Sequence, residues 1–174
     1  MHNGDRAILR DRAKKLAFVP EPTNEETVQV LRFLLGTETY AVEYAHIVEV
    51  APLLHVTPLP CVPSFVRGII NLRGRIVSIL DLKSLFGLPD IDSTSTTSAI
   101  ILQSPLIEFG LLVDEILGMS TIPLSGLQVS LPTLTDIRSE YLKGVTAEGL
   151  VLLDAEKFLA DKKLLVNETV RSTV

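Results

Sequence analysis

The 174-residue sequence contains one cysteine, no tryptophan and only 5% aromatic residues. With Cys61 alone, no disulfide can form within the chain, and this fits a protein of the reducing cytoplasm. Because large aromatic rings are scarce, a core must be built mainly from valine, leucine and isoleucine, which supply most of the 47% hydrophobic fraction. A chain of this length buries roughly two thirds of its unfolded surface, so a core of that kind is expected.

Long apolar runs are also missing. The longest, such as residues 99–102 and 150–153, are far shorter than the roughly 20 residues that cross a bilayer. The N-terminus, MHNGDRAILRDRAKKLA, carries charges throughout and has no continuous apolar segment or small-residue cleavage site, so it is not a secretory signal. The sequence therefore predicts a cytoplasmic protein without direct membrane insertion.

Basic charge is in excess only at the N-terminus. The formal net charge is −5, but residues 1–17 hold five basic and two acidic residues, which gives +3 there and leaves −8 for the rest. An acidic body is poorly suited to nucleic acid, because neutralising phosphates supplies most of that affinity. We therefore expect no nucleic-acid partner.

Catalytic patterns are absent from the sequence. It has no phosphate-binding glycine loop, no GxSxG elbow and no paired-histidine helix motif. His46 and His55 have no carboxylate or cysteine partners at ligand spacing, and Cys61 has no base nearby in sequence. Asp114 and Glu115 are adjacent, so on a strand they would point to opposite faces and could not share a proton. We expect a protein that is not an enzyme, with no catalytic, cofactor-binding or metal-binding residues.

The clearest local signal is residues 65–87, FVRGIINLRGRIVSILDLKSLFG. Two runs rich in β-branched residues flank the polar break at 73–75, which predicts a β-hairpin with Gly74 in the turn. Asp81 can then cap a short helix that ends at Gly87.

The order of elements recurs after a polar linker at residues 90–98, DIDSTSTTS. Residues 108–117 align with 39–48 without a gap, residues 141–145 match 65–69, and Asp154 can cap a helix as Asp81 does. Strands at short intervals with brief helices predict an all-β fold of two small antiparallel barrels, each closed to remove its exposed edges. Two such barrels side by side leave a groove between them.

These patterns predict the organisation of the whole chain. Residues 5–17 predict an N-terminal amphipathic helix, docked or frayed rather than a membrane or partner anchor. Residues 43–50 predict a short helix that bends into a strand. The expected divisions are an N-terminal helix and linker at 1–25, a domain at 26–168 with barrels at about 28–90 and 98–155 and a C-terminal helix at about 155–164, and a tail at 169–174.

Arg73 is the strongest candidate for a binding residue. An arginine beside a turn glycine is ordinarily a solvated surface residue, and that is the alternative interpretation. At the rim of a rigid hairpin, however, its guanidinium can offer a planar fork of donors to a carboxylate or amide of a partner protein. Glu49 is a possible counter-charge, and exposed Ile47 or Val48 would add an apolar patch of the kind that receives a partner helix.

Three segments together resemble a known family. They are FLLGTETYAVEYAHIVEV, FVRGIINLRGRIVSILDL and EYLKGVTAEGLVLLDAEKFL, and over residues 28–164 the sequence closely resembles the CheW family of chemotaxis coupling proteins. The resemblance implies a fold of two five-stranded SH3-like β-barrels. It also implies a non-enzymatic scaffold of two-component signal transduction that joins methyl-accepting chemoreceptors to the regulatory domain of a CheA-type histidine kinase.

The resemblance also implies site residues. A receptor-binding groove between the barrels would use Val42, Ile47, Glu49 and Arg73. Contacts to the kinase regulatory domain would lie in the second barrel, at Val113, Asp114, Glu115 and Leu117.

Two departures from the family pattern favour a related alternative. The N-terminal helix is longer than a minimal coupling protein needs, and Tyr44 is bulky where an aliphatic residue is usual, so the partner could be the sensor of a non-flagellar chemosensory pathway.

The kinase also contains a CheW-like domain, but this chain has no room for an ATP-binding domain and starts with Met1, so we expect a stand-alone coupler. A small-barrel module that binds a ligand or nucleic acid is the remaining alternative.

Overall fold

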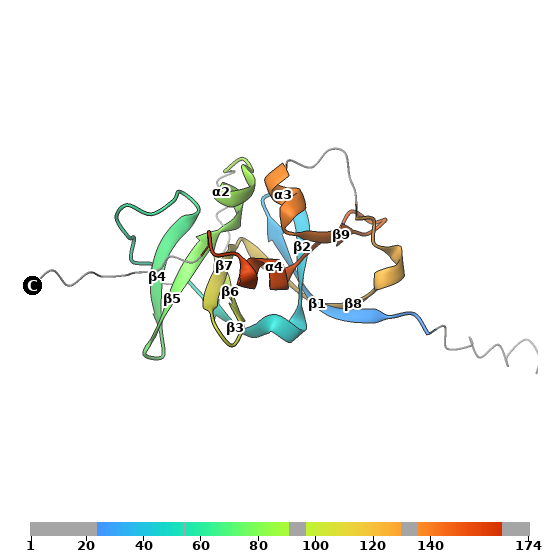
Figure 1. The fold of residues 1–174 in the computed structure, drawn as a ribbon, viewed down its shortest axis with the longest axis horizontal. Coiled ribbons are helices and arrows are strands. Elements are labelled where there is room, and N and C mark those ends of the chain that lie inside the picture. The colour runs from blue at the N-terminus through green and yellow to red at the C-terminus, as the bar shows by residue number, and fades with distance from the viewer. Residues whose placement is uncertain (1–23, 54, 91–96, 130–135, 165–174) are drawn as a thin grey trace, which may run out of the picture.

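A computed structural model describes residues 24–53, 55–90, 97–129 and 136–164 of the chain (Figure 1). The predicted N-terminal helix at 5–17 and the predicted tail at 169–174 lie outside these residues. In the part of the chain that the structure describes, no helix is long and apolar enough to span a membrane.

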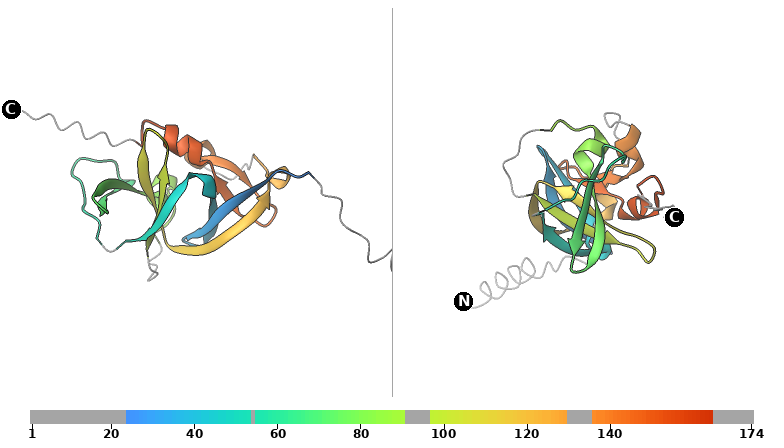
Figure 2. Two further views of the ribbon diagram at one scale, coloured as in Figure 1. Left: turned by 90° about the horizontal axis from the view of Figure 1, so that it is seen from below. Right: turned by 90° about the vertical axis from the view of Figure 1, so that its left-hand side faces the viewer.

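The described residues form two five-stranded sheets that lie side by side (Figures 1 and 2). The first sheet, here the terminal sheet, has the order β8 (Glu115–Pro123), β1 (Thr27–Leu35), β2 (Glu38–Glu43), β10 (Val151–Leu153) and β9 (Leu142–Val145). The second, here the central sheet, has the order β3 (Ile47–Pro52), β6 (Ser98–Gln103), β7 (Glu108–Val113), β5 (Arg75–Asp81) and β4 (Val66–Leu72). Short helices accompany them: η1 (Tyr44–His46), α2 (Leu82–Phe86), η2 (Leu124–Gly126), α3 (Asp136–Glu140) and α4 (Ala155–Ala160).

The sheets do not follow the expected division of the chain into barrels at 28–90 and 98–155. Each sheet takes strands from both sides of the linker, because β1 and β2 pair with β8 and β10, while β3 and β5 pair with β6 and β7. The chain crosses between the sheets after β2, through η1, and after β7, at Asp114. Hydrophobic alternation predicts a strand but does not identify its partner, so the crossing was not visible in the sequence.

The predicted internal repeat is present, and the two repeats exchange strands symmetrically. Each sheet combines two strands of one repeat with three strands of the other, and each contains one parallel pair, β2 with β10 and β7 with β5. The predicted helix caps are also present. The carboxylate of Asp81 accepts the Ser84 backbone N–H at 3.2 Å, and that of Asp154 accepts the Lys157 N–H at 3.1 Å.

The strand ladders describe two sheets rather than two closed barrels, and an isolated bridge reaches across the edges of each. Thr57, which follows edge strand β3, exchanges two 2.9 Å hydrogen bonds with Ile69 of β4 at the other edge. Gln128, after β8, does the same with Val145 of β9. Each bridge packs against a glycine at the matching place in the repeat: a Cβ on Gly68 would lie 2.2 Å from the Thr57 carbonyl oxygen, and one on Gly144 would lie 2.9 Å from Leu127 Cβ.

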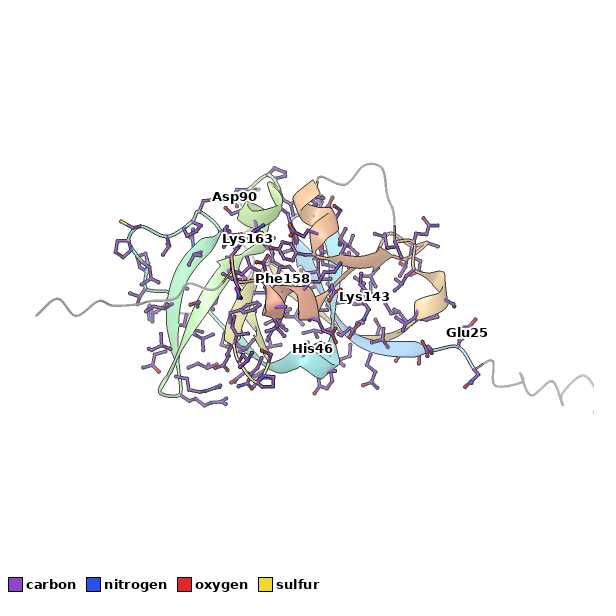
Figure 3. All side chains as sticks on the ribbon, in the orientation of Figure 1. Glu25, His46, Asp90, Lys143, Phe158 and Lys163 are labelled. Atoms are coloured by element: carbon purple, nitrogen blue, oxygen red, sulfur yellow. The ribbon has the colours of Figure 1, made fainter. Side chains whose placement is uncertain are left out.

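The largest core cluster joins the two sheets into one body. A chain of ring contacts runs through it from Phe33 to Tyr141, and Phe158 of α4, labelled in Figure 3, lies 4.5 Å from Tyr141 between ring centroids. Each sheet also has a small cluster of its own: Val30, Ala41, Ile122, Leu150 and Leu152 in the terminal sheet, and Ile70, Val77, Ile79, Ala99 and Ile101 in the central sheet. Strands such as β2 are therefore buried on both faces.

Candidate functional site

The β4–β5 hairpin predicted from the sequence is present, and its tip forms the candidate site. Arg73 and Gly74 are the two loop residues, and both have positive φ angles, of 51° and 85°. The Gly74 N–H donates to the Asn71 side-chain oxygen at 2.8 Å, which fixes the turn. A two-residue loop with both residues in the left-handed region has the twist that a hairpin requires. The Arg73 backbone is therefore held in one place.

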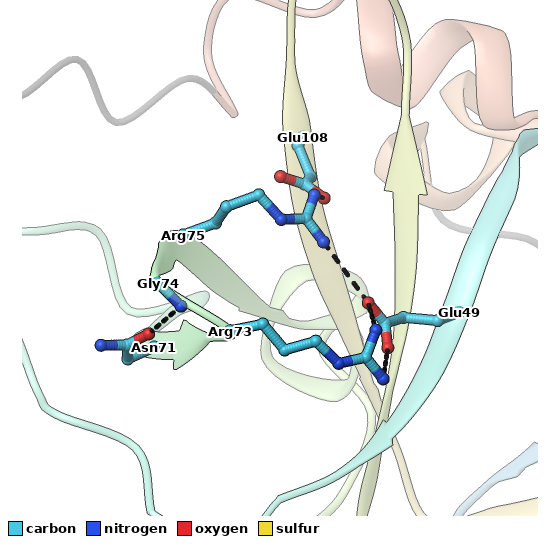
Figure 4. Close-up of polar contacts among 6 residues, drawn as sticks. All are labelled: Glu49, Asn71, Arg73, Gly74, Arg75 and Glu108. Carbon is cyan, nitrogen blue, oxygen red and sulfur yellow. Dashed lines mark hydrogen bonds and ion pairs between the residues drawn. The ribbon is translucent and has the colours of Figure 1, made fainter.

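Four charged side chains meet at this tip, and we name them the charge row: Arg73, Glu49, Arg75 and Glu108 (Figure 4). Arg73 Nη2 lies 3.1 Å from Glu49 Oε2, and Arg75 Nη2 lies 3.4 Å from Glu49 Oε1. Arg75 also pairs with Glu108. The row joins the hairpin to β3 and β7, so three separate segments position it.

The charge row is buried unevenly. The carboxylate side chains of Glu49 and Glu108 are only 18% and 17% exposed, whereas the Arg73 side chain is 78% exposed. Arg73 therefore presents its guanidinium to solvent while it remains in contact with Glu49. A group that is accessible and also held in place can serve as a docking contact for a carboxylate.

The structure brings together some of the residues predicted for the receptor groove and separates another from them. Glu49 and Arg73 form the expected ion pair, and Ile47 lies on the same strand as Glu49, partly buried against the main core. Val42 is fully buried in that core, so its side chain does not reach a surface groove. Strand β2, which carries Val42, packs against the other sheet on one side and against its own sheet's cluster on the other.

Exposed apolar side chains lie on the segments that carry the charge row. Val48 is exposed on β3, next to Glu49 in sequence. Sequence reasoning missed Ile76, which follows Arg75 in β5, and Leu106, which lies two residues before Glu108 and is almost fully exposed. An apolar residue within a turn is the signal that could have identified Leu106.

The residues predicted to contact the kinase divide into a buried pair and an exposed pair. Val113 is fully buried in the main core. Asp114 is also buried: it accepts the Gly36 N–H at 2.7 Å and lies 3.0 Å from Lys83 Nζ. Glu115 and Leu117 are exposed on edge strand β8 of the terminal sheet. Only this second pair can touch a partner directly.

The Asp114–Lys83 pair is electrostatically favourable in the fold. Burial of the Lys83 ammonium lowers its pKa, but the hydrogen bond and negative charge of Asp114, assisted by Asp90, outweigh burial and leave the pKa raised. The pair links the β7–β8 junction to α2, and the Gly36 bond extends it to the β1–β2 turn. The pair therefore stabilises the β7–β8 junction, where the chain passes from the central sheet to the terminal sheet.

Charged groups also meet at His46 and around Lys83. His46, for which the sequence offered no carboxylate partners at ligand spacing, lies 3.8 Å from Glu43 and 3.9 Å from Glu156 (Figure 3). Among the described residues, no group of three or more His, Cys, Asp or Glu side chains is arranged to hold a metal ion. A cavity of about 510 Å³ includes Lys83 and Asp114 in its lining, and these two charges already neutralise each other.

Comparisons with known proteins agree on one family. The model of the CheW-like domain matches residues 29–163. The chemotaxis protein CheW of Treponema pallidum is 31% identical over 153 residues, which cover 84% of this chain and 90% of that protein. The protein PilI of Pseudomonas aeruginosa is 28% identical over 127 residues, 71% of each chain. The crystal structure of the scaffolding protein TtCheW from Thermoanaerobacter tengcongensis has a TM-score of 0.70 at 25% identity and covers 83% of this chain and 95% of that one.

Proposed function

The chain belongs to the CheW family, and on this premise we propose that it is a non-enzymatic adaptor that couples chemoreceptors to a CheA-type histidine kinase in bacterial chemotaxis. The observation that carries the proposal is the charge row, which holds an accessible arginine at the rim of one sheet. A scaffold acts by geometry: it holds two partners in a fixed relation so that the state of one biases the other. The single core between the two sheets supports such rigidity.

Each partner is assigned its own sheet. The cytoplasmic tip of the receptor docks at Arg73, Glu49 and Ile47 on the central sheet. The regulatory domain of the kinase docks at Glu115 and Leu117 on the terminal sheet. Each sheet, with the bridge across its edges, is taken as one SH3-like barrel, and the adaptor works in the cytoplasm.

A second candidate comes from the likeness to PilI, whose name differs from that of the chemotaxis relatives. The exposed Tyr44, at the start of η1 and close to Glu49 in sequence, is bulky where the family pattern has an aliphatic residue. Both observations favour a sensor of a non-flagellar chemosensory pathway as the partner that docks at Arg73, Glu49 and Ile47.

Charge reversal at the rim tests the receptor assignment. Arg73→Glu is expected to weaken capture of the chain by an immobilised receptor tip by at least about tenfold, because like charges at an interface cost on the order of several kcal/mol. The fold is expected to survive, because Arg75 still neutralises Glu49. The measurement is binding of the purified variant to receptor-tip beads, with circular dichroism to verify the fold.

Lys162→Glu is the matched control. It reverses an exposed charge beyond the end of α4, on a segment that carries none of the charge row, and is expected to leave capture unchanged. If Arg73→Glu is captured as well as the control, Arg73 does not belong to the docking site.

A further inference from the structure

The charge row alternates in sign and is anchored at one end. It runs from the exposed Arg73 to the partly buried Glu49 carboxylate, then to Arg75 and to the partly buried Glu108 carboxylate. Glu49 therefore contacts two cations, whereas among the described residues Arg73 forms an ion pair with Glu49 alone. Arg75 lies between two carboxylates, and this fixes its guanidinium (Figure 4).

This arrangement affects what happens when Arg73 turns to a partner. If Glu49 had Arg73 as its sole cation, binding would leave a carboxylate that is only 18% exposed without a counter-charge. An uncompensated charge in such a place is strongly unfavourable, so the loss would offset the gain from the new contact. With Arg75 in place, Glu49 stays neutralised after Arg73 departs.

We propose that Arg75, held by Glu108, is a positioning residue that keeps Glu49 neutralised and so frees Arg73 to bind a carboxylate on the receptor. The inference rests on the proposed function for the identity of the partner. It adds two residues to the docking site and a chemical requirement: the receptor presents an aspartate or glutamate side chain to the hairpin tip. Arg75 need not touch the receptor itself.

The fixed hairpin loop suits this exchange. The loop holds the backbone of Arg73 through the Asn71–Gly74 bond, while the long side chain is largely exposed and free to change rotamer. Arg73 can therefore pass from Glu49 to a partner carboxylate without movement of the hairpin. A bidentate pair with that carboxylate would give the contact both affinity and direction.

The first test uses the free protein and needs no receptor. Arg73→Gln is expected to change the unfolding equilibrium constant by less than about threefold, because Arg75 remains beside Glu49. Arg75→Gln is expected to change it more, because Glu108 also loses its cation. In the double variant, the unfolding equilibrium constant is expected to rise by at least about fivefold more than the product of the two single increases, because the two arginines are coupled through Glu49. The measurement is urea denaturation of all four proteins. Additive losses would overturn the claim that the two arginines substitute for each other.

The second test measures the affinity of the receptor tip in a cycle with Glu49. Arg75→Gln is expected to weaken binding about tenfold, or about 1.4 kcal/mol, when Glu49 is present. In a Glu49→Gln background the same change is expected to alter binding by less than about twofold, because the Glu49 charge that Arg75 neutralises is gone. Glu108→Gln should act in the same direction as Arg75→Gln.

The outcomes separate the two proposals. An equal effect of Arg75→Gln in both backgrounds would mean that Arg75 contacts the receptor directly, and the positioning role would be wrong. Wild-type protein that does not bind the receptor tip would refute the proposed function, and the urea cycle would then decide alone whether the two arginines share Glu49.

Discussion

Gly68→Ala is expected to lower the free energy of unfolding by at least about 3 kcal/mol, which places it among the largest single-residue effects in proteins of this size. An alanine Cβ would lie 2.2 Å from the Thr57 carbonyl oxygen, a backbone atom that cannot rotate away. The φ of Gly68, 145°, is also one that residues with a side chain rarely adopt. The substitution would therefore break the two hydrogen bonds between Thr57 and Ile69 that join the edges of the central sheet.

Gly36→Ala separates conformational strain from the steric clash. Gly36 has a positive φ of 61°, but a Cβ there would meet nothing within 4 Å. This variant is expected to lose only about 1 kcal/mol, the usual cost of a left-handed alanine. Urea denaturation of both variants gives the comparison, and equal losses would mean that the bridge at Thr57 contributes nothing to stability.

Asp114→Ala is expected to destabilise the protein by about 3 kcal/mol. The substitution removes the acceptor of the Gly36 N–H and the main counter-charge of Lys83, both at a buried crossing between the sheets. Asp90 is the other carboxylate near Lys83, but it is exposed and lies farther away, at 3.4 Å. The measurement is the urea midpoint of the variant against that of the wild type.

The adjacent Glu115 provides the control for this prediction. Its side chain is exposed on β8, so Glu115→Ala is expected to change stability by less than about 0.5 kcal/mol. The double variant Asp114→Ala/Lys83→Met is expected to recover part of the loss, because no uncompensated ammonium remains. An Asp114→Ala midpoint equal to that of Glu115→Ala would contradict the structural role of the buried pair.

Local features of the fold were predictable because they depend on neighbouring residues. Two β-branched runs around Gly74 predicted a tight hairpin, and the structure contains that hairpin. Asp81 and Asp154 precede short apolar turns, and both cap helices. The aligned segments of the repeat also occupy equivalent strands.

Long-range features were not predictable in the same way. Strand exchange between the repeats depends on which strands pair across long sequence separations. The alternation within a single strand does not identify its partner. The burial of Val42 and Val113 follows from the same exchange, because their strands lie in the middle of a sheet and beneath the opposite one. Both residues were expected to contact partners and instead belong to the core.

The candidate site was half predictable. The Arg73–Glu49 pair could be anticipated from an arginine at a hairpin tip and an acid in an apolar strand. The second half, Arg75 with Glu108, joins residues that are 33 positions apart and belong to different repeats. Without knowledge of the β5–β7 pairing, nothing in the sequence placed these two side chains together.

The central claim, that this chain physically links a receptor to a kinase, is tested most directly by reconstitution. Receptor-tip beads are incubated with the CheA-type kinase in the presence and absence of the purified chain, and the kinase retained on the beads is quantified. We expect retention to rise several-fold when the chain is added and to fall back with Arg73→Glu. Kinase retention that does not depend on the chain would contradict the adaptor function.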